Sequence, residues 1–343
     1  QRFMFDYIPE MYADEFADTE KEALEWVDEV ISGKLATKRR PPELLTRDVV
    51  AKAINSERDA GRASEHGGAY LDISWRTPED VKKKLPGMYH QFKELAAVDI
   101  TTTKMEVGPT AHYVMGGVKV HPETQESTVI GLYAAGEAAT GLHGANRLGG
   151  NSLSDLIVFG KIAGEHAAAR AEKIDSFTEI PDEEIADVIS ETLAPFGREG
   201  GENPASVVED LREMMQEKVG IIRTGTLLNE ALSDLDELEK RAAITSPGGS
   251  RIYNPGWHQA LELGAMIDVS RMCALAALQR EESRGGHTRD DFPESDHKHW
   301  GKVNSVITQG KDGSMEIEHT SYPAIDEELK ALLDADDLDQ EGE

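Results

Sequence analysis

A glycine-rich segment decides the fold: HGANRLGGNSL, residues 143–153. Together with Gly141 it places four glycines in ten residues, so its backbone can approach a ligand closely, and it leads into a predicted helix at 154–173. Gly136 and Glu137 precede it, at the end of an expected strand, where a carboxylate can accept hydrogen bonds from a ribose. The pattern predicts a ligand-binding loop. The alternative is a structural turn with a surface arginine, which has the same composition.

Apolar spacing and turn residues predict the elements that precede this loop. Thr19 is the expected N-cap and Gly33 the expected stop of the first helix, and the three lysines at 82–84 are expected on a solvated helix face. The expected elements are helices at 20–32 and 46–61, a β-like run at 69–73, and strands at 113–115, 118–120 and 129–133. The last three strands predict a small sheet that returns to a larger one.

Long helices are expected in the second half of the chain. Asn-Pro pairs at 203–204 and 254–255 each place an N-capping side chain before a proline at the first helical position. With another helix from about Gly225, they predict an antiparallel three-helix bundle. Beyond Gly286 the chain is expected to be irregular and acidic, with a frayed tail at 326–343.

The composition is globular and strongly acidic. The 343 residues are 39% hydrophobic and 29% charged, which excludes wholesale disorder. There are 65 Asp and Glu against 36 Lys and Arg, and this net charge of -29 repels phosphate backbones, so no nucleic-acid partner is expected. The single cysteine, Cys273, excludes an internal disulfide and is expected to be a buried, inert thiol. No apolar stretch approaches the roughly 20 residues of a membrane span.

Two further residues are candidates for a functional site. Arg47 is expected in the first turn of a helix, where the helix dipole disfavours a cation by up to about 1 kcal/mol unless Asp48 neutralises it. His112 precedes a strand and two glycines, although a lone histidine in such a place is more often structural. The histidines and aspartates at 287–299 are loosely spaced, so no metal site is predicted.

Five motifs in order point to one family. They are HYVMGG at 112–117, AGEA at 135–138, the segment at 143–153, NPGW at 254–257 and SRGGH-x-R-x-DFP at 283–293. Together they resemble the flavoprotein subunit of succinate dehydrogenase or fumarate reductase, and the resemblance runs from Arg2 to about Pro323.

This resemblance implies an α+β multidomain fold in four parts. They are part of a capping domain at 1–111, the returning segment of an FAD-binding α/β domain at 112–171, a helical bundle domain at 172–285, and a small C-terminal domain with an acidic tail at 286–343.

The resemblance also implies roles for individual residues. Arg47 resembles the arginine that moves the substrate proton, and His112 and Arg147 resemble the pair that binds the dicarboxylate. Glu137 resembles the acidic residue that contacts FAD, and the pair Ser152–Leu153 resembles the two residues whose backbone borders the flavin ring. The implied cofactor is therefore FAD.

The implied activity is that of respiratory complex II in the tricarboxylic acid cycle. Succinate would be oxidised to fumarate by hydride transfer to FAD, and the electrons would pass first to an iron–sulfur subunit, then to quinone. Membrane anchor subunits would hold the protein, which has no span of its own, on the inner, cytoplasmic face of the cell membrane.

Some features depart from the family pattern and leave alternatives open. No G-x-G-x-x-G occurs, and the family's dinucleotide fold and its FAD-attaching histidine would precede Gln1, so residues 1–343 alone are expected to be inactive and without FAD. The loop before His143 also resembles L-aspartate oxidase, and a non-catalytic fragment or scaffold is a further alternative. The excess acid is expected to form the solvated surface of a protein from a salt-adapted, halophilic source.

Overall fold

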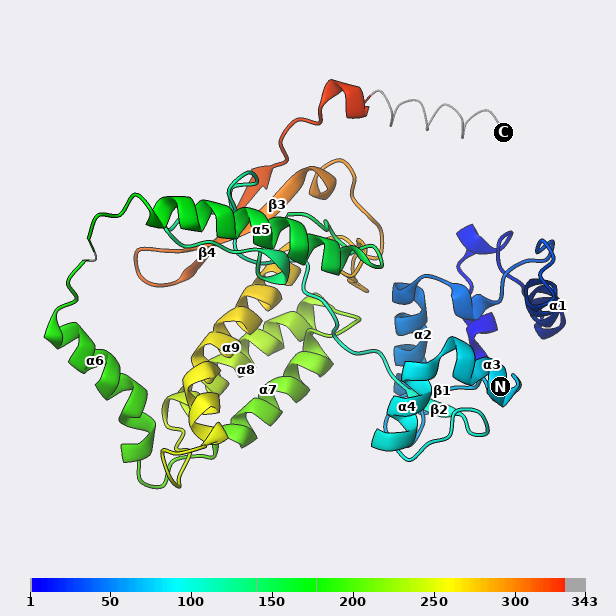
Figure 1. Cartoon of the computed structure of the whole chain (residues 1–343), viewed down its shortest axis with the longest axis horizontal. Helices are drawn as coiled ribbons and strands as arrows, with labels where there is room; N and C mark the ends of the chain where they lie inside the picture. Colours follow the sequence, from blue (N-terminus) through cyan, green and yellow to red (C-terminus); the bar gives the residue numbers. More distant parts are fainter. Residues whose placement is uncertain (1, 140, 177, 331–343) are drawn as a thin grey trace. The chain divides into compact units, whose positions relative to one another are not determined.

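The computed structural model describes residues 2–139, 141–176 and 178–330, and it divides into two units, 1–114 and 115–343 (Figure 1). Each unit has its own buried cores and both contain helices and strands. The division bears on the candidate site, because Arg47 and His112 belong to the first unit and the glycine-rich loop to the second. The predicted domain boundaries at 111, 171 and 285 stay predictions.

The first unit is built from short helices and one two-stranded sheet. Its elements are η1 Phe3–Tyr7, η2 Glu10–Tyr12, α1 Glu20–Ile31, η3 Pro42–Leu44, α2 Arg47–Asp59, β1 Ala69–Leu71, α3 Pro78–Lys84, α4 Pro86–Leu95 and β2 Met105–Val107. Strands β1 and β2 pair antiparallel, with Ala69 opposite Val107. Its two cores are centred on Met4, Phe16, Leu45 and Ala53, and on Val81, Ile100 and Met105.

Local signals place α1, α2 and α3 where the sequence predicts helices, whereas α4 was not predicted. The Thr19 hydroxyl accepts a hydrogen bond from the Glu22 N–H at the start of α1. Gly33 follows the helix with a φ of 74°, a left-handed conformation that glycine adopts without a steric penalty. Lys82 to Lys84 lie exposed in the last turn of α3, where positive side chains interact favourably with the helix dipole.

The second unit holds the longer helices and a β-hairpin. Its elements are η4 Gly136–Ala138, α5 Asn151–Ala171, α6 Asp182–Leu193, η5 Ala194–Gly197, α7 Pro204–Lys218, α8 Gly225–Ala243, α9 Pro255–Gln279, η6 Trp300–Lys302, β3 Val303–Gln309 and β4 Met315–Ser321. The hairpin pairs β3 with β4 from Val303 opposite Ser321 to Gln309 opposite Met315.

Helices α7, α8 and α9 pack side by side as the predicted bundle (Figure 1). Each contributes fully buried residues to one core, among them Val207, Leu228 and Leu263. The predicted caps are confirmed: Asn203 accepts from the Ala205 N–H, and the Asn254 side chain accepts from the Trp257 N–H at the start of α9. The bundle is therefore specified by apolar spacing together with locally encoded starts.

Two predictions about strands are wrong. The segments 118–120 and 129–133 take part in isolated bridges, such as Val118 with Ala139, and none of the segments 113–115, 118–120 and 129–133 belongs to a strand ladder among the described residues. A strand needs a continuous partner, and single bridges do not supply one. Conversely, the region after Gly286 was expected to be irregular but contains the β3–β4 hairpin, whose loop Gly310–Gly313 turns between two runs of alternating residues.

The buried thiol is a third wrong prediction. Cys273 is exposed on α9, although nearby protein still desolvates its thiolate and raises the pKa of the thiol. Most of the expected frayed tail, residues 331–343, lies outside the described residues. No helix in the described part of the chain is long and apolar enough to cross a membrane.

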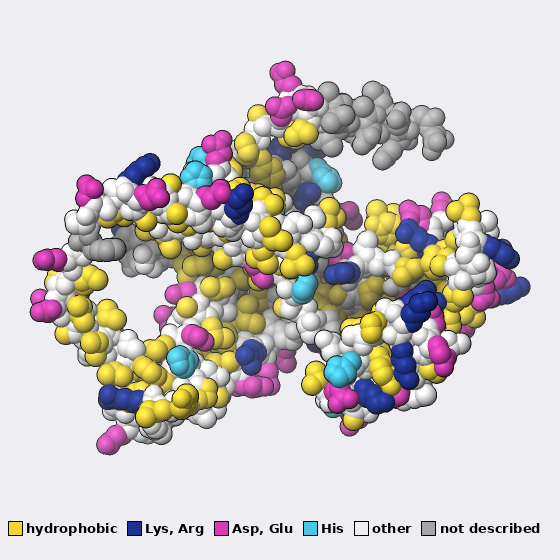
Figure 2. All heavy atoms as spheres, viewed as in Figure 1, with side chains coloured by type: hydrophobic (Ala, Val, Ile, Leu, Met, Phe, Trp, Pro, Cys, Tyr) yellow, Lys and Arg dark blue, Asp and Glu magenta, His cyan; other side chains and the backbone are white. Residues whose placement is uncertain are grey.

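Acidic side chains are spread over the surface of the described chain. On the face shown in Figure 2 they alternate with lysines, arginines and apolar side chains instead of gathering in one patch. Some of them pair with cations, as Glu22 does with Arg39 at 2.7 Å and Glu239 with Arg271 at 2.8 Å. The excess of acid is therefore dispersed on this face and forms no single docking patch there.

Candidate functional site

The glycine-rich loop ends at the N-terminus of α5. Gly150 occupies the N-cap position with a φ of 87° and has no side chain to accept from the first-turn amides. Those N–H groups have no partner inside a helix, and together with the helix dipole they favour an electron-rich ligand. A Cβ at Gly149 or Gly150 would meet nothing within 4 Å, so the backbone is uncovered on that side. Although the Asn151 N–H donates to the carbonyl of Leu148 at 3.3 Å, no side chain caps the helix start.

Gly136 holds the preceding turn, η4, against α5. Its φ is 67°, and a Cβ at this position would overlap the Cδ2 of Leu156 on α5. The Val118 N–H donates to the carbonyl of Ala138 at 2.8 Å from the other side. Because η4 is fixed in this way, the exposed carboxylate of Glu137 lies on a turn that is packed on α5.

A buried pair anchors the loop to the same helix. The Nε2 of His143 lies 3.3 Å from Oδ2 of Asp155, and the two side chains are 7% and 5% exposed. A histidine at the start of the loop is thus tied to the second turn of α5. This pair was not predicted from the sequence. The only sign of it there is that His143 and Asp155 lie on either side of the predicted helix start, twelve residues apart.

The structure brings four of the predicted site residues together in the second unit. Arg147 is half-buried, and its Nη1 donates to the neighbouring carbonyl of Leu148 at 3.2 Å. Ser152 and Leu153 lie in the first turn of α5, and Leu153 is 69% exposed. Glu137 lies on η4, which packs on α5 where Gly136 meets Leu156. The roles of these residues at a flavin-binding edge stay predictions.

Arg47 and His112 belong to the first unit. Arg47 is the first residue of α2, as predicted, and it is exposed. It forms no ion pair with Asp48 among the described residues, although Asp48 lies in the same first turn of α2. His112 is exposed in the segment between β2 and the end of the unit. The combined clamp of Arg47, His112 and Arg147 stays a prediction.

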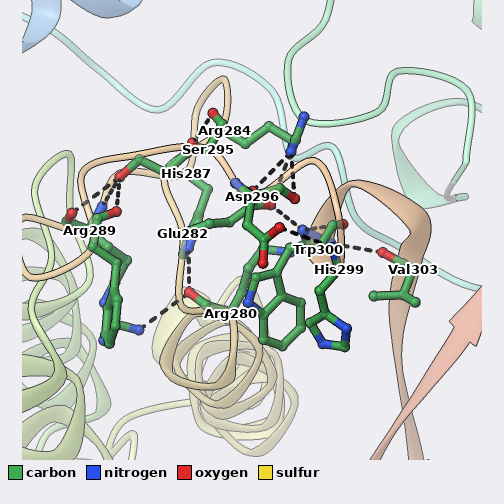
Figure 3. A network of polar contacts seen from close by, with 12 residues as sticks. Arg280, Glu282, Arg284, His287, Arg289, Ser295, Asp296, His299, Trp300 and Val303 are labelled. Carbon is green, nitrogen blue, oxygen red and sulfur yellow. Dashed lines mark hydrogen bonds and ion pairs between the residues drawn. The ribbon is translucent and has the colours of Figure 1, made fainter.

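The C-terminal motif forms an ion network that the sequence did not reveal (Figure 3). Glu282 is fully buried and accepts from Arg280 at 2.5 Å and from Arg284 at 3.0 and 2.9 Å. Burial raises the pKa of the Glu282 carboxyl, but the hydrogen bonds from Arg284 and Arg280 outweigh it and leave that pKa below its usual value. Asp296 contributes its backbone N–H to the same carboxylate.

His287 and Asp291, two of the loosely spaced acids and histidines, also bind arginines. Arg223 Nη1 lies 3.0 Å from Nδ1 of His287, and Arg289 pairs with Asp291. No group of three or more histidine, cysteine or carboxylate side chains that could hold a metal ion occurs within 2–139, 141–176 and 178–330. Arginines and acids are concentrated between 280 and 291, but their order in the sequence does not show which of them pair.

Two family models match separate parts of the chain. Residues 2–153 match the family model for an FAD binding domain, and residues 208–331 match the model for the fumarate reductase flavoprotein C-term. A fumarate reductase (CoM/CoB) subunit of Methanothermobacter marburgensis is 41% identical over 261 residues, which is 74% of this chain and 45% of that protein. The fumarate reductase flavoprotein subunit of Escherichia coli is 36% identical over 262 residues, 74% of this chain and 43% of that protein.

A solved structure shows the same fold. Mycobacterium smegmatis Sdh1 in complex with UQ1 superposes with a TM-score of 0.77 at 46% identity, over 88% of this chain and 51% of that chain. The chain spans about half the length of the curated relatives it matches.

The residues present fit the edge of a flavin. The isoalloxazine ring is apolar on its faces and carries carbonyl oxygens at one edge, so it needs an apolar surface beside main-chain donors. Leu148 and Leu153 are 74% and 69% exposed, on either side of the uncapped start of α5. The two matching family models, the relatives and the shared fold lead to one conclusion: the chain belongs to the fumarate reductase/succinate dehydrogenase flavoprotein family, whose cofactor is FAD.

Proposed function

We propose that this chain carries the dicarboxylate site and part of the flavin site of an enzyme that interconverts succinate and fumarate. The observation that carries the proposal is the continuity of Arg147 with the start of α5. Only four residues separate Arg147 from Ser152, so a cation and the bare helix N-terminus lie within one short loop. A carboxylate bound by the arginine would lie beside the place where the main chain fits a flavin.

The residue types suit a substrate with two carboxylates. A guanidinium can bind a carboxylate through two parallel charge-assisted hydrogen bonds, and an imidazole adds a further donor. Arg147 and His112 would bind the two ends of succinate and hold its central carbons in place. FAD, when bound, supplies the two-electron acceptor or donor for the reaction.

Arg47 would hold and move the proton that is lost from the second central carbon. A free guanidinium has a pKa above about 12 and is a poor base, so this role requires a carboxylate partner and a water-poor site. Asp48 is adjacent to Arg47 in the sequence, but the two form no ion pair in the described part of the chain.

The electrons would pass to an iron–sulfur subunit, then to quinone, with anchor subunits holding the enzyme at the cytoplasmic face of the membrane. The similarity to Sdh1 in complex with UQ1 supports a quinone partner. A second candidate is electron exchange with thiols, because a 41% identical relative is named as a CoM/CoB fumarate reductase subunit. L-aspartate oxidation is a third candidate, and its only support is the resemblance of the loop before His143 to L-aspartate oxidase.

The test is an assay of the FAD-loaded enzyme that contains this chain. Succinate oxidation with a dye acceptor and fumarate reduction with a reduced dye are expected, and L-aspartate is expected to give no turnover. Arg147→Gln should lower kcat/KM for succinate by roughly a hundredfold or more, since a bound carboxylate loses its charged partner. Arg170→Gln, at the other end of α5, is the matched control and should leave kcat/KM unchanged. Turnover of aspartate without succinate would contradict the proposal.

A further inference from the structure

The turn Arg284–His287 contacts the loop that carries Arg147. The N–H of Gly286 donates to the carbonyl of Ala145 at 2.9 Å. A Cβ added at Gly285 would lie 2.6 Å from that carbonyl oxygen and 2.9 Å from the Cβ of Asn146. These distances leave no room for a side chain at Gly285. Two segments far apart in the sequence therefore meet through their main chains, two residues before Arg147.

The turn is rigid because its ends are fixed to each other. The Arg284 N–H donates to the His287 carbonyl at 2.8 Å, and the His287 N–H donates back to the Arg284 carbonyl at 3.0 Å. The Arg284 guanidinium binds both carboxylate oxygens of the fully buried Glu282 (Figure 3). A buried ion pair that is also hydrogen-bonded fixes a single geometry, and it does so here at the base of the turn.

The imidazole of His287 ties the same turn to the helical bundle. Its Nδ1 lies 3.0 Å from Nη1 of Arg223, which can only donate, so Nδ1 accepts and Nε2 carries the hydrogen. That Nε2 donates to the carbonyl of Arg280, just beyond α9, at 3.1 Å. Burial lowers the pKa of His287 to about 4, so the ring stays neutral and keeps both contacts at neutral pH.

We propose that Gly285 and Gly286 are positioning residues for Arg147. Through them the helical bundle fixes the position of the loop at 143–150, which carries Arg147. This rests on the role proposed above for Arg147. Gly286 supplies the hydrogen bond that holds Ala145, and Gly285, with a φ of 57°, lets the two main chains approach. The pair of His143 and Asp155 holds the start of the loop, and the hydrogen bond from Gly286 to Ala145 holds a second point, two residues before Arg147. A displacement of about 1 Å in a substrate-positioning side chain such as Arg147 can lower the rate by about a hundredfold.

The test compares glycine variants in the FAD-loaded enzyme that contains this chain. Gly285→Ala is expected to lower kcat/KM for succinate at least tenfold, mainly through a raised KM, with FAD retained. Hydrogen exchange of the amides at 143–150 should become faster. Gly248→Ala is the matched control, since Gly248 has a φ of 59° and a Cβ there would meet nothing within 4 Å. It carries the same backbone strain and should change neither readout.

Gly285→Asn separates strain from contact. Asparagine tolerates a positive φ better than alanine but keeps the Cβ that would collide with Ala145. The proposal expects Gly285→Asn to raise KM and loosen the loop as Gly285→Ala does. Recovery of wild-type KM and exchange in Gly285→Asn would overturn it, as would unchanged values in Gly285→Ala. If the wild-type enzyme itself turns over neither succinate nor fumarate, the proposed function fails, and exchange at 143–150 shows separately whether the contact positions the loop.

Discussion

Arg289 and Asp291 form a two-pronged ion pair in which Nε and Nη2 of the guanidinium each donate to a different carboxylate oxygen at 2.8 Å. Arg289 is 2% exposed, and its Nη1 donates to the carbonyls of Ala277 and Leu278 at the end of α9. Asp291 also accepts from the N–H of Gly225 at the start of α8. One ion pair, in which the arginine is buried and the Asp291 side chain is 35% exposed, therefore connects the end of α9 to the beginning of α8.

Arg289→Ala is expected to lower the free energy of unfolding by about 2 to 4 kcal/mol, because it leaves two helix-end carbonyls without their donor and removes the charged partner of Asp291, whose partial exposure limits the cost. Urea unfolding followed by circular dichroism measures the change. Arg212→Ala, which removes an exposed arginine on α7, should cost less than about 0.5 kcal/mol. A loss below about 1 kcal/mol for Arg289→Ala would show that the pair does not hold the helix ends together.

His287 predicts a loss of stability on acidification. Its pKa is lowered to about 4 by burial, with Arg223, Arg280 and Arg289 adding like charge, against about 6.5 in an unfolded chain. Between those values the unfolded state binds a proton that the folded state does not, so the free energy of unfolding falls as pH falls from about 6.5 to 4. The expected loss from this group is about 2 to 3 kcal/mol.

His287→Gln should flatten this part of the pH profile, measured by urea unfolding at several pH values. His258→Gln, at an exposed position on α9, is the control and should retain the wild-type slope. Parallel profiles for wild type and His287→Gln would place the acid sensitivity elsewhere.

Arg47→Lys tests the proposed proton-transfer role. Lysine keeps the positive charge but loses the planar fork of donors, so turnover of succinate should fall by roughly a thousandfold while FAD stays bound. Steady-state kinetics with a dye acceptor, together with the flavin absorbance, measure both quantities. Arg58 lies in the last turn of the same helix, and Arg58→Lys should retain activity. Near-normal turnover in Arg47→Lys would remove Arg47 from the chemistry.

The acid excess predicts that salt stabilises the protein. At a net charge of -29, self-repulsion opposes the folded state, and KCl screens it over distances of about 10 Å at 0.1 M. Melting temperature at neutral pH is expected to rise with KCl, with most of the rise below about 1 M. Near the sequence pI of 4.7 the same titration should have little effect. A flat response at neutral pH would contradict the proposal of a salt-adapted source.

The sequence predicted those features that depend on near neighbours. Thr19, Asn203 and Asn254 cap helices through amides two or three residues away, so each helix start was visible locally. The glycine-rich loop and the helix after it were predicted for the same reason, apart from a start at Asn151 rather than 154.

Features that depend on distant partners were not predictable. The segments at 113–133 have strand-like composition, but pairing decides a strand, and among the described residues Val118 forms a single bridge, with Ala139. Cys273 has apolar neighbours in sequence, yet its face of α9 is exposed. The ion network at 280–296 and the contact of Gly286 with Ala145 depend on how the chain folds back on itself, which no local pattern encodes.

The meeting of Gly286 with Ala145 also limits how relatives can be recombined. It joins the part of the chain that matches one family model, residues 2–153, to the part that matches the other, residues 208–331. A chimera that takes these two parts from different parents crosses this contact even when its junction lies in the linker between them. Libraries built from this family should therefore inherit the turn at 284–287 and the loop at 143–150 from a single parent.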